Sequence, residues 1–517
     1  MGSHLRGNGT TEPSCVLEIP FRRLSSTPIS LSEAQTCQYR FLDCHNFTRG
    51  ESLRIVQFSQ LPVGEYSALS YVWRGLKRQA DIAAGSDSFI SIKGADGADP
   101  ISVDVLRLAC LLSISLGCGF LWLDGVCIMQ SNTDDKDWQI QRMHDIYKFC
   151  KECIVIPGGL SRLATLFEET FWIHRAWTLQ EAIAPPSAKC LFAWEDGDCV
   201  FQSNFPVFVK VVEEGTAAMA DMKGLLQMSL KGSFKIVTMD QDWKVQTERD
   251  SGADITIFGD SHTQLSQIAA LIGAMDLKGE EGMANAIWRS SFTRSARYPV
   301  DRVFSIMGLL SVTLDTSKFG PEDDLGATLA LMRTMLEDGR RAEWLAIATR
   351  MDVNPELSTL PVFPKPSMSG TAVVATEDGD KEVSMLMDSW WSIGKTPVGV
   401  LDDAGYFRFE ALGVPVCRVD GEEKPGSVFG SARGGIWKVS PDHTGSIYAV
   451  FIGKKERYRS GIASWMTDPQ DSTLMLIEEH APEKFHVVEY AFVSQDIMQA
   501  TGWAKRLFEV GGTGPRG

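Results

Sequence analysis

The feature that most constrains the fold is a repeated alternation of apolar strand-like runs with helix-like runs over the first 200 residues. The strand-like runs cover residues 66–72, 88–93, 120–124, 152–159 and 188–194. Helix-like periodicity appears at residues 103–116, 135–150 and 171–183. Because strands buried on both faces are apolar throughout, this order predicts an α/β domain with a parallel sheet and helices on both faces.

The remainder of the chain has a different pattern. Residues 201 to 350 are rich in helix-like runs, a segment rich in proline and small residues follows at 354–370, and short alternating strand-like segments lie beyond it. A chain of 517 residues exceeds what one hydrophobic core usually holds. We therefore expect three regions: an α/β domain at 15–200, a helical region at 201–350 and a β-rich C-terminal region at 351–517.

The charge and the cysteine content limit which partners and which cellular compartment we expect. The chain has 50 basic and 66 acidic residues, for a formal charge of −16, which repels nucleic acid and anionic lipid at long range. Eleven cysteines at irregular spacing in a large chain are typical of reduced thiols. No secretory signal is apparent in the first ten residues, which look like an expression remnant. We expect a cytoplasmic protein without nucleic acid as a partner.

One apolar stretch has the length of a membrane span. Residues 105–123 are largely apolar, but they contain Arg107 and a break at Gly117-Cys118-Gly119. A helix, a turn and a buried strand account for this stretch better, so we expect no membrane span.

Polar and aromatic side chains follow the predicted strands, and the run "LWLDGVCIMQ" at 121–130 shows this most clearly. Ligands of open parallel sheets bind beyond the carboxyl ends of the strands, where loops and helix ends meet. The pattern therefore predicts a ligand site there. Its candidate residues are Ser70, Tyr71, Trp73, Arg74 and Gly75 after one strand, Asp124, Cys127 and Gln130 after another, and Arg175, Trp177, Gln180 and Glu181 on the helix after a third.

These residues also have structural interpretations. Asp124 is the strongest candidate, because a carboxylate next to a buried strand must be hydrogen-bonded or functional. Trp177 and Glu181, four residues apart, would share one helix face. However, Trp177 could equally pack in the core, and Glu181 could be a solvated charge or form an ion pair with Arg175. The glycines at 158–159 permit an anion-binding turn, although two glycines alone are a weak signal.

The cysteines suggest two further hypotheses, a metal site and a nucleophile. Cys150 and Cys153 have the spacing of a zinc half-site, but no second pair follows, so we expect buried thiols at a helix-to-strand junction and no metal. Cys127 has the alternative role of a nucleophile with His144 or His174 as its base. The sequence places neither histidine beside the end of that strand.

Three blocks of this sequence resemble the fungal heterokaryon-incompatibility (HET) domain. They are "YSALSYVWRG", "LWLDGVCIMQSNTDDKDWQIQRMHDIY" and "HRAWTLQEAI", and with "CQYRFLDC" and "ISVDVLRLACLL" they cover about residues 35 to 185. Arg74 and Met129 depart from the family, which usually has Trp directly before Gly and Asn before Gln. "RSARYPVDRVFSIMGLL", residues 294–310, resembles the segment that commonly follows this domain. Within it, Asp301 and Arg302 suggest a salt bridge at a helix start.

The resemblance implies a fold and an activity. HET domains are similar to TIR domains, which have a flavodoxin-like α/β fold and whose enzymatic members cleave NAD. The resemblance therefore implies a TIR/flavodoxin-like parallel sheet flanked by helices, followed by the helical and β-rich regions. The catalytic glutamate of those enzymes lies in a Trp-Cys-x-x-Glu helix, and "WTLQE" matches it with Thr178 in place of Cys. Glu181 is thus the catalytic residue that the resemblance implies.

In this hypothesis the protein cleaves NAD, as a substrate rather than a cofactor, at the bond between nicotinamide and ribose. A carboxylate stabilises the oxocarbenium-like centre that develops there. The contacts to the substrate come from Trp177, Trp73 or Tyr71 for stacking, Arg74 or Arg175 with the glycine turn for the diphosphate, and Asp124 and Gln130 for ribose hydroxyls. The alternative is a non-catalytic signalling module that self-associates or binds a protein partner. Either way, the resemblance implies self/non-self recognition and regulated cell death.

Overall fold

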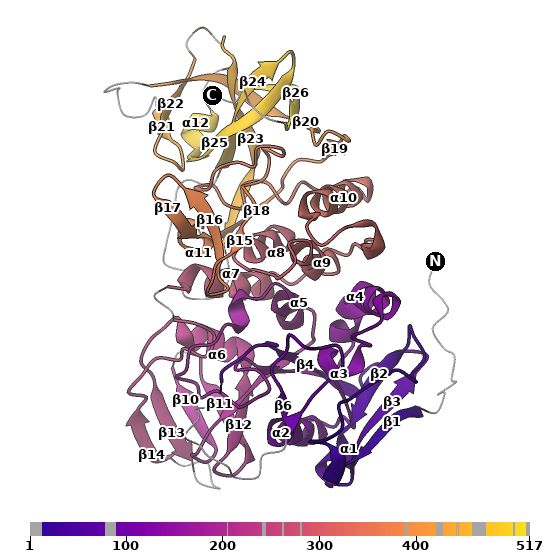
Figure 1. Ribbon diagram of the computed structural model, residues 1–517. Helices are drawn as coiled ribbons and strands as arrows, with labels where there is room; N and C mark the ends of the chain where they lie inside the picture. Colours follow the sequence, from indigo (N-terminus) through magenta and orange to yellow (C-terminus); the bar gives the residue numbers. More distant parts are fainter. Residues whose placement is uncertain are drawn as a thin grey trace, which may run out of the picture. The chain divides into compact units, whose positions relative to one another are not determined.

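The computed structural model describes residues 13–77, 89–203, 205–239, 245–260, 263–279, 282–387, 391–419, 428–440, 442, 444–457, 472–499 and 502–512 (Figure 1). The chain divides into two compact units. The first contains the residues up to 172 together with 184–259, and the second contains 173–183 together with 260–517. Helix α5 (Trp177–Ile183) therefore belongs to the second unit, although it lies in the sequence between two strands of the first.

The first unit is built on one large mixed sheet. Among the described residues its strand order is β1-β3-β2-β7-β4-β8-β9-β12-β11-β10-β13-β14. The strands are β1 (Ser14–Pro20), β2 (Tyr39–Asp43), β3 (Ser52–Phe58), β4 (Tyr66–Tyr71), β7 (Phe120–Trp122), β8 (Glu152–Ile156), β9 (Ala188–Ala193), β10 (Cys199–Gln202), β11 (Val207–Glu213), β12 (Ala217–Asp221), β13 (Lys235–Met239) and β14 (Val245–Asp250).

The centre of this sheet is parallel, as the sequence predicted. Strand β4 pairs in parallel with β7 on one side and β8 on the other, and β8 pairs in parallel with β9. Numbered along the chain, these four strands stand in the order 2-1-3-4. Their side chains, such as Leu69, Ile154 and Val155, are almost completely buried, which explains the continuous apolar runs.

The two sides of the sheet are antiparallel, which the prediction of a parallel sheet missed. Strands β1, β3 and β2 form one side, and β12, β11, β10, β13 and β14 form the other. Strands β10 to β14 therefore extend the sheet of the first unit, and α6 (Met222–Ser229) lies between β12 and β13 in the chain. We expected a helical region from residue 201, but the run of consecutive helices begins only with α7 (Leu265–Asp276).

Helices flank the parallel centre. They are α1 (Cys44–Thr48), α2 (Val103–Ser115), α3 (Asp124–Cys127) and α4 (Thr133–Lys148), with a 3-10 turn at Phe21–Arg23. Helices α2 and α4 begin where Ser102 and Asn132 accept hydrogen bonds from the amides of Val105 and Asp135, as N-cap side chains do. The predicted strand at 88–93 is reduced to β5 (Phe89–Ile90), paired with β6 (Ile101–Ser102) in a separate small sheet, and residue 88 lies outside the described residues.

A buried ion pair holds the loop after α3. The side chains of Arg40, in β2, and Asp135, in α4, are both fully buried and in contact. Arg40 also donates from Nε to the carbonyl of Cys127 at 2.8 Å, and Asp135 accepts from the amide of Met129 at 3.0 Å. The pair thereby fixes residues 127–130, and with them the end of the strand that carries the predicted site.

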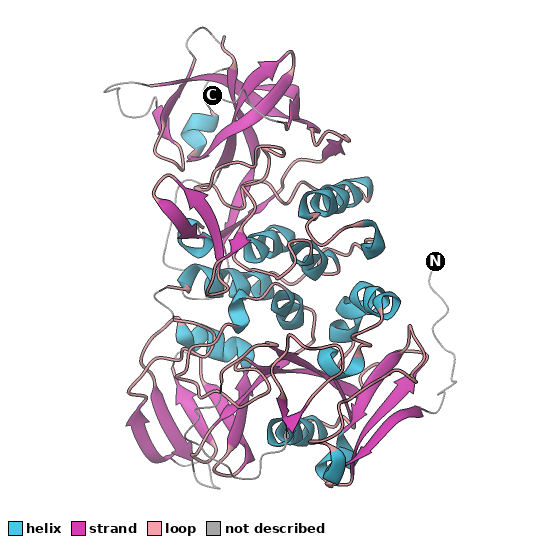
Figure 2. Ribbon diagram, viewed as in Figure 1, coloured by secondary structure: helices cyan, strands magenta, loops and turns pink. Residues whose placement is uncertain are grey.

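The second unit combines helices with β-sheets (Figure 2). Its helices are α5 (Trp177–Ile183), α7 (Leu265–Asp276), α8 (Met283–Phe292), α9 (Asp301–Met307), α10 (Asp324–Glu337), α11 (Val383–Leu386) and α12 (Gln495–Met498), with 3-10 turns at Trp172–His174, where the units join, and Thr316–Lys318. A small sheet contains β15 (Lys365–Pro366), β16 (Ala372–Thr376) and β17 (Gly379–Glu382).

A larger C-terminal sheet confirms the predicted β-rich region. Its described strands are β18 (Trp391–Gly394), β19 (Gly399–Leu401), β20 (Phe407–Arg418), β21 (Val428–Gly430), β22 (Ile436–Val439), β23 (Ile447–Arg457), β24 (Ser472–Ala481), β25 (Lys484–Val493) and β26 (Ala504–Val510). Val414, Trp437, Leu474 and Leu476 lie in its hydrophobic core. None of the helices in the described stretches combines the length and apolar character needed to cross a bilayer.

The Arg40–Asp135 pair leads to a stability prediction. Replacing Asp135 with Asn leaves the buried guanidinium without its counter-charge, and breaking a buried pair typically costs about 3–5 kcal/mol. The matched control is Glu213→Gln, which breaks the part-exposed pair with Arg107, a change worth about 1 kcal/mol or less. Urea unfolding followed by circular dichroism measures both. Equal shifts of the two unfolding midpoints would contradict the importance of the buried pair.

Candidate functional site

The residues predicted to form the site divide between the two units. Ser70, Tyr71, Trp73, Arg74, Gly75, Asp124, Cys127 and Gln130 lie in the first unit, and Arg175, Trp177, Gln180 and Glu181 lie in the second. Each group has its own geometry.

Asp124 organises the group in the first unit. It is the first residue of α3, whereas the sequence placed it at the end of a strand over residues 120–124; the observed strand β7 ends at Trp122. Its carboxylate accepts a hydrogen bond from Trp73 Nε1 at 2.6 Å through Oδ2, and from the amide of Gly125 at 2.7 Å through Oδ1. Gln130 Nε2 donates to the Asp124 carbonyl at 2.8 Å. The structure thus brings Trp73, Asp124 and Gln130 together and joins the loop after β4 to the loop after β7.

Tyr71 and Ser70 contact different neighbours. The hydroxyl of Tyr71 lies 3.3 Å from the amide of Gly125, and a Cβ added at Gly125 would lie 2.7 Å from that oxygen. Glycine at 125 therefore permits the close approach of the tyrosine. Ser70 is fully buried and accepts a hydrogen bond from Trp172 Nε1 at 2.8 Å, which is a packing role.

The glycines at 75, 158 and 159 hold two loops against each other. A Cβ on Gly75 would lie 2.0 Å from the carbonyl oxygen of Gly158, and Leu76 donates its amide to that same oxygen at 2.8 Å. The exposed Arg74 donates from Nε to the carbonyl of Gly97 at 2.8 Å. Close packing of the loops after β4 and β8 therefore explains these glycines without an anion.

Cys127 has the properties of a structural thiol. It is fully buried, and burial raises the pKa of its thiol to about 12. In the second unit, burial and the charge of Arg294 lower the pKa of His174 to about 4. At neutral pH the thiol is protonated and His174 is neutral and weakly basic, so these protonation properties give no support to a cysteine nucleophile with His174 as its base.

Cys150 and Cys153 occupy the junction of α4 and β8, and both are buried as the sequence suggested. The Cys150 thiol lies 3.0 Å from the carbonyl of Tyr147, and burial raises its pKa to about 12. Within the described ranges no group of three or more histidine, cysteine, aspartate or glutamate side chains is arranged to hold a metal ion.

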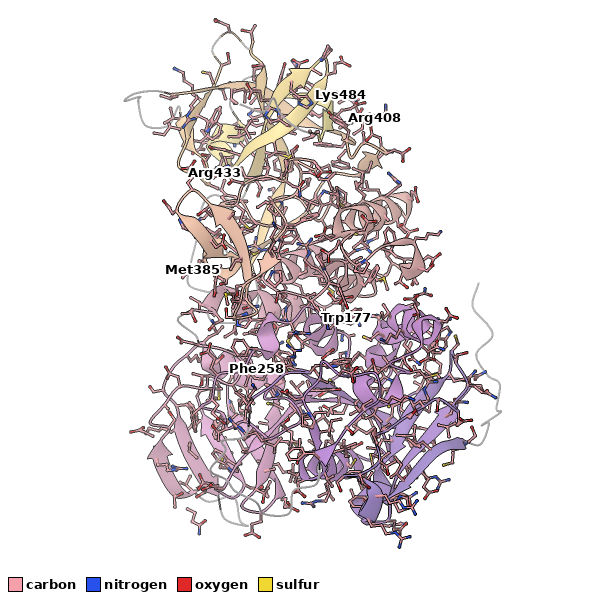
Figure 3. The ribbon with its side chains drawn as sticks, in the orientation of Figure 1. Trp177, Phe258, Met385, Arg408, Arg433 and Lys484 are labelled. Atoms are coloured by element: carbon pink, nitrogen blue, oxygen red, sulfur yellow. The ribbon has the colours of Figure 1, made fainter. Side chains whose placement is uncertain are left out.

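Helix α5 carries the group in the second unit and is shorter than the predicted helix at 171–183. It begins at Trp177, which Figure 3 labels, because the preceding residues pair with another segment. Ser295 donates its amide to the carbonyl of His174 at 2.7 Å and accepts from the amide of Ala176 at 2.9 Å. These extended-chain hydrogen bonds are incompatible with a continuous helix. Trp177 and Glu181 remain one helical turn apart.

Arg294 stabilises the start of α5. This buried arginine donates from Nη1 to the carbonyl of Arg175 at 3.0 Å and to the hydroxyl of Thr178 at 2.7 Å. The hydroxyl of Thr178 supplies one of these acceptors. Burial lowers the pKa of Arg294 to about 9, while the negative charge of Glu181 acts in the opposite direction. Glu181 is only 8% exposed.

Asp301 is a second carboxylate near α5. It begins helix α9, and its side chain is hydrogen-bonded to Trp177. Partial burial raises the pKa of Asp301 to about 6, while the Trp177 hydrogen bond and the charge of Arg175 act to lower it. Arg302 pairs with Asp324 at 3.0 Å, so the expected pair between Asp301 and Arg302 was wrong in its partner.

Two residues of this group, Arg294 and Asp301, were absent from the predicted site. Arg294 and Asp301 lie more than 100 residues beyond α5 in the sequence, and only the segment 294–310 gave a signal for them. Gln180, which was predicted, is 1% exposed, and its Nε2 has no hydrogen-bond partner among the described residues. A carboxylate, an indole and a guanidinium therefore meet around one short helix.

Comparison with known proteins supports part of the resemblance. Residues 66–167 match the family described as heterokaryon incompatibility protein (HET). The vegetative incompatibility protein HET-E-1 of Podospora anserina is 25% identical over 154 residues, which cover 27% of this chain and 11% of that protein. The matched part is thus about a tenth of the relative's length. No solved structure matches this chain significantly.

The environment of Cys127 predicts its reactivity. Because its thiol is buried with a pKa near 12, iodoacetamide at pH 8 should leave Cys127 unmodified in the folded protein. The exposed Cys15 is the internal control and should be alkylated. Peptide mass spectrometry measures both, and alkylation of Cys127 as fast as that of Cys15 would contradict the structural role.

The raised pKa of Asp301 predicts a pH dependence of stability. The folded-state pKa of Asp301, about 6, lies above its ordinary value of 3.8, so the unfolded state loses its proton first as pH rises. The carboxyl group therefore contributes stability below about pH 4 that is lost as pH rises to about 6. Asp301→Asn removes this contribution. Relative to the wild type, the thermal midpoint of the variant should rise between pH 4 and pH 7, and a constant difference would refute the assignment.

Proposed function

We propose that this chain acts in heterokaryon incompatibility, the recognition of self and non-self between fungi. The match of residues 66–167 to the HET family carries this proposal, and the similarity to a vegetative incompatibility protein supports it. The eleven cysteines, all free thiols, support a reducing compartment such as the cytoplasm.

The chemical activity that we propose is cleavage of NAD between nicotinamide and ribose, with Glu181 as the catalytic residue. Three features of α5 support it: the glutamate is largely buried, it lies one turn after Trp177, and it stands in "WTLQE", the segment that resembles the catalytic helix of TIR enzymes. The order 2-1-3-4 of the parallel strands gives further support, because flavodoxin-like sheets begin with the same order.

The side chains around α5 suit this reaction. A carboxylate placed beside the anomeric carbon stabilises the positive charge that develops as the bond to nicotinamide breaks. Nicotinamide departs as a neutral ring, so no strong acid is required. The part-exposed indole of Trp177, held by Asp301, presents a face for a cationic ring to stack on.

In the second unit, Arg175, two residues before α5, would contact the diphosphate. For the candidate residues of the first unit, the roles given by the sequence stay predictions: stacking by Tyr71 and Trp73, a diphosphate contact from Arg74, and ribose hydroxyls bound by Asp124 and Gln130. Asp124 could bind a hydroxyl only if its carboxylate gave up or shared the hydrogen bond from Trp73 Nε1.

A second candidate function is non-catalytic assembly through the HET-like domain. One observation favours it: Glu181 and Asp124 both have structural tasks, since Glu181 offsets the charge of buried Arg294 and the Asp124 carboxylate holds Trp73 and Gly125. In this case the protein would bind a partner or a second copy and turn over no nucleotide.

The test incubates purified protein with NAD and follows nicotinamide by chromatography. Glu181→Gln should reduce release by about 100-fold or more, the loss that follows removal of one group stabilising the transition state. Glu337→Gln, an exposed glutamate in α10, is the matched control and should keep full activity.

The folded state of each variant is checked by its thermal melt, because Glu181 also offsets the charge of Arg294. A Glu181→Gln protein that melts cooperatively and releases nicotinamide at the wild-type rate would remove Glu181 from the mechanism. Wild-type protein that assembles on addition of a partner without consuming NAD would instead support the non-catalytic candidate.

A further inference from the structure

The second unit contains a pocket that the proposed activity does not use. It has a volume of about 250 Å³ and lies between the segment 294–302, the start of α10 and the segment 363–366. Helices α9 and α10, which border it, are labelled in Figure 1. All of its lining residues belong to the second unit, so its geometry is independent of the first.

The lining of the pocket is rich in cations. Arg294, Arg302 and Lys365 line it, against two carboxylates, Glu322 and Asp324. Both arginines are buried, being 1% and 6% exposed, whereas Lys365 is exposed. A local excess of positive charge in a chain whose formal charge is −16 marks this pocket as a place for an anion.

Arg302 is held in a fixed orientation. Its Nη2 pairs with Asp324 at 3.0 Å, and its guanidinium carbon lies 4.3 Å from the ring centre of Phe363 and 4.9 Å from that of Phe292. The Nη1 atom is buried and has no hydrogen-bond partner among the described residues. A buried donor without an acceptor is costly, and a guanidinium pairs well with the oxygens of a phosphate.

Burial also raises the free energy of the charged forms of the two arginines. It lowers the pKa of Arg294 to about 9 and that of Arg302 to about 10, and the neighbouring carboxylates Glu181 and Asp324 offset this only in part. An anion in the pocket would stabilise both charged forms.

The rest of the wall is apolar and stiff. Phe363 and three prolines line the pocket, and proline rings restrict the backbone. A volume of about 250 Å³ lies just below the range of about 300–1,000 Å³ for pockets that hold drug-sized ligands. A pocket of this size and lining suits a small molecule that carries a compact carbon skeleton beside its charge.

We propose that this pocket binds a small phosphate monoester, with the phosphate facing Arg294, Arg302 and Lys365 and the carbon skeleton packed on Phe363. Arg294 also donates to the carbonyl of Arg175 and the hydroxyl of Thr178 at the start of α5. An occupied pocket would therefore stabilise the helix that carries Glu181. The binding itself does not depend on whether Glu181 cleaves NAD.

The test is isothermal titration of the full chain with ribose 5-phosphate and inorganic phosphate, and with ribose as the uncharged probe. Ribose 5-phosphate should bind more tightly than phosphate, because it also contacts the apolar wall, and ribose should not bind measurably. Lys365→Gln should weaken the binding of ribose 5-phosphate by roughly 3- to 10-fold, as expected for one partly solvated charge contact.

Two further variants sharpen the test. Glu322→Gln removes a negative charge from the lining and should tighten binding by about 2- to 5-fold. Lys505→Gln, which changes an exposed lysine in β26 that does not line the pocket, should leave binding unchanged. Lys365 and Glu322 are exposed, so neither substitution should prevent folding, and thermal melts verify this.

Three results would overturn the proposal. The first is wild-type protein that melts cooperatively but binds neither phosphate compound at millimolar concentration. The second is binding of ribose as tight as that of ribose 5-phosphate. The third is binding that neither Lys365→Gln nor Glu322→Gln alters, which would place the anion elsewhere on the chain.

Discussion

The buried pair of Arg40 and Asp135 is the constraint on which the first unit depends. Removing two charges from water is expensive, and only a full set of hydrogen bonds offsets the cost. Arg40 donates to the carbonyls of Cys127 and Gln35, and Asp135 accepts from the amides of Cys37 and Met129. Each of these bonds fixes a loop that has no regular pairing of its own. The Arg40–Asp135 pair therefore fixes the turn that carries Asp124, although Asp124 itself is not a member of the pair.

The second unit also contains a deeply buried arginine, Arg294. It donates hydrogen bonds to a carbonyl and a hydroxyl, and the negative charge of Glu181 favours its charged form. A buried cation stabilised in this way retains a strong attraction for further anions. This property links the two proposals for this unit. The same arginine holds the helix of the proposed catalytic glutamate and lines the pocket proposed for a phosphate monoester.

The sequence predicted the centre of the fold well and its edges poorly. Strands such as β4 and β8 are buried on both faces, so their apolar runs are unmistakable, and helices α2 and α4 have clear caps and periodicity. Strand β14 is exposed along its whole length and has no buried face to produce a pattern. It joins the sheet through backbone hydrogen bonds to β13, which leave no mark on side-chain composition. The sequence pattern after residue 200 therefore gave no indication of these strands.

For the site, the sequence by itself determined which polar residues stand next to strand ends and that Trp177 and Glu181 share a helix face, because both follow from local periodicity. It also indicated the HET-like segment, which the family match supports. Tertiary structure alone decided the partners: Trp73 for Asp124, Arg294 for Glu181, and Asp301 for Trp177. These partners lie between 51 and 124 residues apart in the chain. Local pattern cannot encode such contacts, because they exist only once packing has excluded water and forced each buried charge or donor to find a neighbour.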